Sequence, residues 1–160
     1  MFNRFVKDAR QIVTQAHTIA SGLGSPMVEA EHLLLALTEA TVTQGSLAEA
    51  GLDTHGLREA LERENERSLA AVGISPAAFD LPPVADAGTK PQWATSAKLA
   101  LERSLKVAMA RKDSRIEPAH LVLGVLRAPV GTVPRALEVA GLDRLALARR
   151  VEAELDQDRS

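Results

Sequence analysis

The sequence predicts an all-α fold in which two pseudo-symmetric four-helix repeats pack into one domain. Ala and Leu, which are strong helix formers, must fill the core, because the chain has only three Phe, one Trp and no Tyr. No alternating stretch of β-branched residues occurs, so strands are not expected. Residues 5–32 also align with residues 93–120 without a gap, as expected for two copies of one supersecondary unit.

The internal repeat divides the chain into three parts. Phe5 aligns with Trp93 and His32 with His120, and after a short insertion both copies pass through Ala-Gly-Leu-Asp at residues 50–53 and 140–143. We therefore predict a first repeat over residues 1–67, a linker over residues 68–92 and a second repeat over residues 93–160.

Four helices are expected in the first repeat. Apolar residues recur at helical spacing between positions 5 and 20, and Gly22 follows as a stop signal. A leucine-rich second helix starts near Ala30, and a short third helix covers roughly residues 44–50. Asp53 is then expected to cap a fourth helix that runs to about residue 67.

The second repeat follows the same plan. Pro118 suits the first turn of its second helix and Pro134 that of its third, while Asp143 is expected to cap its last helix. Between the repeats, helix and strand patterns are both interrupted, which predicts a linker on or near the surface. The interrupting residues are Gly73, Pro76, Pro82, Pro83, Gly88 and Pro91.

Composition and charge exclude several classes of function. The formal net charge is -2, so nucleic acid and anionic membranes are not expected as partners. The absence of Cys excludes disulfides, thiolate nucleophiles and Cys-based zinc sites. Charged residues interrupt the N-terminal segment, and no apolar run is long enough for a membrane helix. We expect a cytoplasmic protein.

Two segments carry a resemblance to a known family. Residues 28–37 read Val-Glu-Ala-Glu-His-Leu-Leu-Leu-Ala-Leu, and residues 116–126 read Ile-Glu-Pro-Ala-His-Leu-Val-Leu-Gly-Val-Leu. Both resemble the Clp N-terminal repeat, whose usual form is close to Ile-Gly-Thr-Glu-His-hydrophobic-Leu-Leu-Gly-Leu. The opening Met-Phe-Asn-Arg-Phe and the Ala9-Arg10 pair are similar to that family as well.

This resemblance implies a protein that binds rather than catalyses. In that family the double repeat precedes an ATPase module and receives substrates and adaptors, whereas this chain has no Gly-x-x-x-x-Gly-Lys-Ser/Thr loop and ends at Ser160. We therefore expect a free-standing, non-catalytic accessory or decoy that needs no cofactor and modulates a Clp chaperone–protease. An adaptor that delivers substrates and a structural subunit of the protease ring remain alternatives. The implied partners are Clp subunits, adaptors, peptides or peptide-like natural products, and the oligomeric state is not predicted.

The resemblance also implies a binding groove between the first helices of the two repeats. A large aromatic anchor, a flexible Met and apolar walls suit a peptide. The implied lining residues are Phe2, Val13, His17, Trp93, Lys98, Glu102, Leu105 and Met109. Trp93 has a second interpretation that the sequence leaves open, because a lone Trp can also plug the core beside the linker.

A second implied site is a residual phosphoarginine site at Glu31. Relatives of the ClpC type use this Glu together with a Thr near the start of each repeat. Here Val6 occupies the Thr position of the first repeat, while Ala94 and Ala119 replace the Thr and the Glu of the second. Phosphate needs hydrogen-bond donors that Val and Ala side chains lack, so the second site is expected to be lost.

His32 and His120 raise the question of a metal site or a general base. They occupy equivalent positions at the start of an apolar helix, and no His-x-x-x-His spacing accompanies them. We therefore interpret them as structural residues that tie the helix start to nearby backbone, and predict no metal site. A small hydrolase or metal enzyme is disfavoured, because no nucleophile–base or ligand constellation is present.

Overall fold

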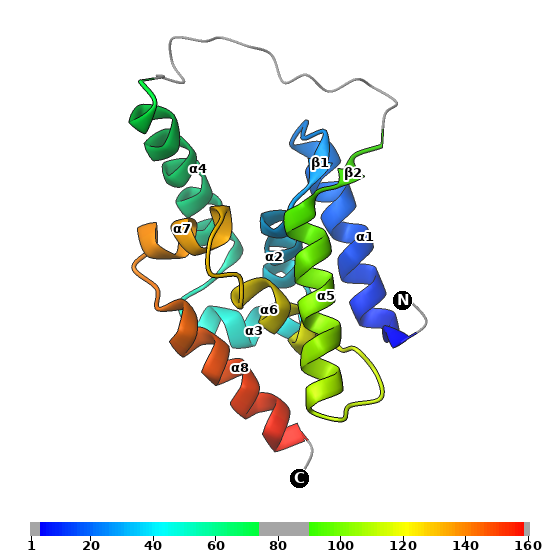
Figure 1. The fold of residues 1–160 in the computed structure, drawn as a ribbon. Helices are drawn as coiled ribbons and strands as arrows, with labels where there is room; N and C mark the ends of the chain where they lie inside the picture. The colour runs from blue at the N-terminus through cyan, green and yellow to red at the C-terminus, as the bar shows by residue number, and fades with distance from the viewer. Residues whose placement is uncertain (1–3, 74–89, 159–160) are drawn as a thin grey trace.

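The computed structural model of the chain describes residues 4–73 and 90–158, and Figure 1 shows their arrangement. These residues form helices and one pair of very short strands. In chain order the elements are α1 (Lys7–Gly22), β1 (Met27–Val28), α2 (Ala30–Glu39), α3 (Thr41–Glu49), α4 (Thr54–Ala71), β2 (Gln92–Trp93), α5 (Thr95–Ala110), α6 (Pro118–Leu126), α7 (Thr132–Val139) and α8 (Arg144–Asp158). The predicted plan of two four-helix repeats is confirmed.

Most predicted helix ends agree with the structure, because short-range capping determines them. The Asp53 carboxylate accepts a hydrogen bond from the backbone N–H of Gly56 at 2.7 Å, and Asp143 caps α8 in the same way. Two boundaries differ: α3 begins at Thr41 rather than near residue 44, and α4 continues to Ala71. Most of the predicted linker, residues 74–89, lies outside the described residues.

The expectation of no strands is wrong in one place. β1 and β2 pair in parallel, with Met27 opposite Gln92 and Val28 opposite Trp93. An equivalent isolated bridge joins Phe5 to Ile116. These residues lie just before helices, where the chain is extended, so their backbone groups pair across the repeats. Because each pairing spans only one or two residues, it needs no alternating sequence pattern.

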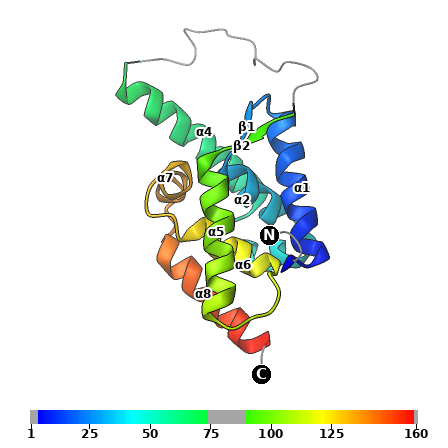
Figure 2. The same ribbon diagram turned by 45° about the vertical axis from the view of Figure 1, so that its right-hand side comes forward.

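The core lies around α2 and α6. Both helices are buried over nearly their whole length, and α1 packs on α2 while α5 packs on α6. The two views in Figures 1 and 2 show α1 and α5 as outer helices, with α8 at the lower end of the molecule. A single hydrophobic cluster includes residues of both repeats, from Phe5 to Leu155. The repeats therefore form one domain, as predicted.

α5 and α6 approach closely at Gly124. A Cβ atom at this position would overlap the Ser104 hydroxyl and the Ala100 carbonyl oxygen, and would lie 2.9 Å from the Ser104 backbone nitrogen. Ser104 is fully buried, and its hydroxyl donates to the Ala100 carbonyl at 2.8 Å. The absence of a side chain at Gly124 therefore sets the distance between these helices.

Within the described ranges, no helix has both the length and the apolar character needed to cross a membrane.

Candidate functional site

The two repeats are joined through a reciprocal exchange of backbone hydrogen bonds. The segment before α1 pairs with the segment before α6, because the Val6 N–H donates to the Ile116 carbonyl at 3.0 Å. The segment before α5 pairs with the segment before α2 in the same way, since the Ala94 N–H donates to the Val28 carbonyl at 3.0 Å. Each repeat therefore supplies the start of its first helix to the other repeat's second helix.

The described residues that were predicted to line a peptide groove belong to α1, β2 and α5. His17 of α1 and Trp93 of β2 are brought together, with ring centroids 6.3 Å apart and planes tilted by 57°. Both side chains are half-buried, and Trp93 packs against the hydrophobic cluster. The Trp93 side chain therefore contacts the core and also reaches the surface.

The other predicted groove residues differ in exposure. Val13 is a core residue, with only 8% of its surface exposed, and Leu105 is half-buried. Lys98, Glu102 and Met109 are exposed, and they share the face of α5 that includes Leu105, since their spacing follows the helical repeat. Phe2 lies outside the described residues.

The two equivalent histidines form matching helix caps. The His32 Nδ1 accepts a hydrogen bond from the Glu29 N–H at 2.8 Å, and the His120 Nδ1 accepts from the Glu117 N–H at 2.9 Å. In return, each glutamate side chain accepts from the backbone N–H of its histidine, which completes a capping box. The structural interpretation of both residues is supported.

Acidification is expected to weaken the cap at His32. Burial lowers the pKa of His32 below 6.5, and the nearby Glu29 opposes this only in part. The unfolded chain therefore binds the proton first, so this stability is present above about pH 6.5 and is lost as the pH falls through the folded-state pKa. Because an Asn oxygen replaces the Nδ1 acceptor without titrating, His32→Asn should lose less stability between about pH 7 and pH 5 in urea unfolding.

His55→Asn is the matched control, since the His55 side chain is 86% exposed. It should follow the wild-type pH profile. Parallel profiles for wild type and His32→Asn would contradict this role of His32.

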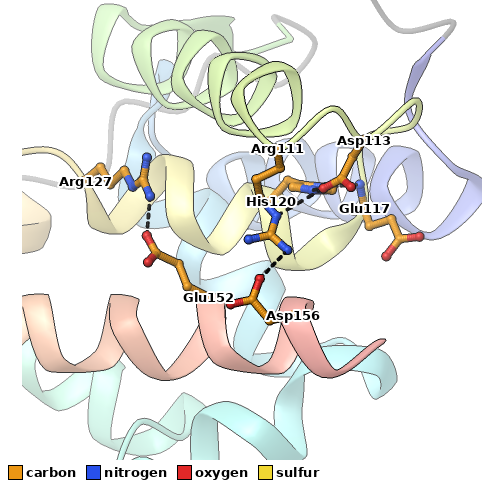
Figure 3. A network of polar contacts seen from close by, with 7 residues as sticks. All are labelled: Arg111, Asp113, Glu117, His120, Arg127, Glu152 and Asp156. Atoms are coloured by element: carbon orange, nitrogen blue, oxygen red, sulfur yellow. Dashed lines mark hydrogen bonds and ion pairs between the residues drawn. The ribbon is translucent and has the colours of Figure 1, made fainter. Parts of the chain in front are cut away.

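A polar network around His120 connects α8 with the loop between α5 and α6 and with the end of α6 (Figure 3). The His120 Nε2 lies 2.8 Å from an Asp113 carboxylate oxygen, which Arg111 Nε also approaches at 3.2 Å. Arg111 then pairs with Asp156 of α8 at 2.9 Å, and Arg127 pairs with Glu152 one turn away. With its Nδ1 and Nε2 atoms both engaged, His120 is a structural residue in this arrangement.

Glu31 lies in the first turn of α2. Burial raises its pKa, and the neighbouring Glu29 and Glu64 act in the same direction, while a backbone hydrogen bond and Arg135 oppose them. The Val6 backbone pairs with Ile116 of the second repeat, and the Ala94 backbone pairs with Val28, which lies shortly before Glu31 in the chain. Val6 and Ala119 line one cavity together. Val6 of the first repeat thus shares a cavity with Ala119 of the second, although the sequence pattern pairs Val6 with Glu31 of its own repeat.

Two adjoining cavities were not anticipated from the sequence. One, of about 380 Å³, lies between α1, α2 and α3, and the other, of about 410 Å³, lies between α1, α3, α6 and α8. They share Asp8 and Val42, and we call them together the acidic groove. Five carboxylates line it, and none of the described lining residues is Lys, Arg or His. These carboxylates are Asp8, Glu39, Glu117, Glu154 and Asp158.

A signal for this groove exists in the sequence repeat. Asp8 aligns with Ser96 and Pro118 aligns with Ala30, so the two joints differ in charge and in hydrogen-bonding capacity. This difference can be interpreted only when it is known that the start of α1 pairs with the segment before α6 of the other repeat. Among the described residues, no group of three or more His, Asp or Glu side chains is arranged to hold a metal ion.

Comparison with known proteins identifies the repeats. A family model described as the Clp repeat (R) N-terminal domain matches residues 4–81 and 93–160. The chloroplastic chaperone protein ClpD1 of Oryza sativa subsp. japonica is 27% identical over 166 residues, which cover 99% of this chain and 17% of that protein. The chain therefore spans about a sixth of the length of this relative.

Solved structures with the same fold come from distant sources. The N-terminal domain of the chaperone ClpD from Arabidopsis thaliana matches with a TM-score of 0.71 and 21% identity, covering 98% of this chain and 97% of that domain. A protein from structural investigations of a malarial protein secretion system matches with a TM-score of 0.71 and 16% identity, covering 96% of each chain. The Hsp104 N-terminal domain from Candida albicans matches with a TM-score of 0.64 and 17% identity, covering 92% of this chain and 88% of that one.

Proposed function

The chain belongs to the Clp N-terminal repeat family, and we propose that it binds peptides or adaptors along α1 and α5 and thereby modulates a Clp chaperone–protease. Clp N-domains in general bind substrates or adaptors. These 160 residues contain no phosphate-binding loop of the Gly-x-x-x-x-Gly-Lys-Ser/Thr type, so the ATP-driven unfolding step is not assigned to them. The role we favour is that of an accessory or decoy.

The observation that carries this proposal is the position of Trp93. Its ring is half-buried beside His17 at the junction of the repeats, with one part on the core and another part accessible. A Trp held in this way loses little conformational entropy on binding and offers a large apolar surface, which is typical of interface anchors.

The exposed face of α5 extends this surface. Met109, with 57% of its surface exposed, supplies a flexible apolar contact, and Lys98 and Glu102 supply one charge of each sign. A peptide chain anchored at Trp93 would run along this face with apolar and polar contacts in turn.

Degradation of a Clp-dependent substrate by a reconstituted Clp ATPase–peptidase tests the proposal. Addition of the wild-type chain should slow degradation in a concentration-dependent manner, as expected of a decoy. Trp93→Ala should weaken this effect by about tenfold or more, since loss of an interface Trp commonly costs 2 kcal/mol or more. Leu145→Ala is the matched control, because Leu145 is an exposed apolar residue of α8, and it should act like wild type.

The direction of the effect separates the related roles. Faster degradation that depends on Trp93 would replace the decoy by a delivering adaptor. Binding to the isolated peptidase ring would indicate the structural subunit. No effect of the wild-type chain on degradation, together with no binding to any Clp component, would contradict the proposal.

A further inference from the structure

The two joints between the repeats are built from equivalent residues but differ in chemistry. At the joint between α5 and α2, the Ser96 hydroxyl donates to the Glu29 carboxylate and accepts from the Ala30 N–H at 2.9 Å. One small side chain therefore satisfies both the acid and the free amide at the start of α2. At this joint, which we call closed, the acid and the amide both have a hydrogen-bonding partner within the protein.

The joint between α1 and α6 has no such closure. Asp8 stands in the place of Ser96, Glu117 in the place of Glu29 and Pro118 in the place of Ala30. A carboxylate cannot donate to a second carboxylate, and Pro118 has no N–H to offer. Asp8, Glu117 and Pro118 all line the larger cavity of the acidic groove. Among the described residues that line this cavity, none is a cationic donor.

The remaining charges of the acidic groove are unevenly compensated. Glu39 is paired with Arg58 at 3.2 Å, and Glu154 accepts a hydrogen bond from Ser46. Among the described residues, neither Asp8 nor Asp158 has a hydrogen-bonding or ion-pair partner on its side chain. The end of the groove that Asp8 and Asp158 share with Glu117 therefore carries three carboxylates that form no ion pair within the described residues. Lys112 and Arg115 line the neighbouring cavity, which Glu117 and Asp158 also border, but they do not line the groove itself.

The groove also has an apolar surface between its charges. Val42 belongs to both cavities and is 55% exposed. Val6, Leu47, Val122 and Val151 add apolar area to the larger cavity. A free metal ion or a small polyamine would leave this area in water, whereas a peptide segment with both apolar and cationic side chains would cover it.

We propose that the acidic groove is a second docking site, which takes a Lys- or Arg-bearing amphipathic segment of a partner protein. An apolar side chain of that segment rests on Val42, and a neighbouring cationic side chain donates to Asp8 and Glu117. The guest cation thereby donates to the glutamate, as the Ser96 hydroxyl does at the equivalent joint. This site is separate from the face along α1 and α5 and does not depend on the ligand of that face.

Fluorescence anisotropy with a labelled short peptide of Lys, Leu and Ala tests the site. We expect saturable binding to the wild-type chain that weakens with added salt, as for exposed charge pairs. Asp8→Lys should weaken binding by about tenfold or more, because close charge pairs at an interface are commonly worth 1.5 kcal/mol or more. Asp8→Ser, which removes the carboxylate and places a hydroxyl donor next to Glu117, should weaken it in the same direction.

Glu59→Lys is the matched control, since it makes the same change in net charge at an exposed position of α4 and should leave binding unchanged. A peptide with Glu in place of Lys, or with Ser in place of Leu, should bind much more weakly. Equal losses in Asp8→Lys and Glu59→Lys would overturn the proposal, because they indicate attraction by net charge alone. Loss of binding in Trp93→Ala but not in Asp8→Lys would place the peptide on α1 and α5 and overturn it as well.

Discussion

Replacement of Gly124 by Ala is expected to destabilise the protein by about 2–3 kcal/mol, although Ala is the better helix former by about 1 kcal/mol. The new Cβ would overlap the Ala100 carbonyl and the Ser104 hydroxyl. A hydroxyl can rotate away, but a helix carbonyl cannot move without its helix, so α5 and α6 must separate. α5 and α6 pack on each other in the core of the second repeat. Urea unfolding followed by circular dichroism measures the loss of stability.

Gly45→Ala provides a control with the opposite sign. Gly45 lies within α3, and a Cβ atom there would meet nothing within 4 Å. It should stabilise the protein by about 0.5–1 kcal/mol through helix propensity and the lower entropy of the unfolded chain.

The first repeat holds Ala36 and Ala16 where the second holds Gly124 and Ser104. Adding Ser104→Ala should therefore recover part of the Gly124→Ala loss. Gly124→Ala with wild-type stability would contradict the close packing of α5 on α6.

The helices of this fold could be predicted because their signals are local. Asp53 and Asp143 cap helices through side chains that reach only a few residues along the chain. The alignment of residues 5–32 with 93–120 also indicated the number of helices in each repeat. The end of α4 at Ala71 was missed, since helical residues continue beyond position 67 until Gly73, which adopts a φ of +78°.

The joints could not be predicted, because they depend on how the repeats face each other. Sequence position places Val6 and Glu31 in one repeat, yet the backbone of Val6 bonds to Ile116 of the other. The short parallel pairing of Val28 with Trp93 has no sequence pattern of its own. The acidic groove is a consequence of this exchange, which explains why Asp8 carried no special signal by itself.

Phe5→Ala is expected to have the largest effect on stability, with a loss of about 4 kcal/mol. Phe5 is fully buried, and its backbone forms the bridge to Ile116 that joins the repeats. Loss of the ring leaves a cavity where both repeats meet, at a cost that is a large part of the 5–15 kcal/mol typical of a whole domain. Urea unfolding can be followed both by circular dichroism and by the fluorescence of Trp93, the only Trp in the chain.

Trp93→Ala at the equivalent position separates the two interpretations of that residue. Because the Trp93 ring is only half-buried, its removal should cost about 1–2 kcal/mol, clearly less than the loss in Phe5→Ala. A smaller cost would mean that part of the ring contributes little to folding and remains accessible to a ligand, as the proposed function requires. A cost equal to that of Phe5→Ala would make Trp93 a core residue, and weaker effects of Trp93→Ala on degradation would then follow from unfolding rather than from a lost contact. Circular dichroism distinguishes these outcomes, since the variant lacks the fluorophore.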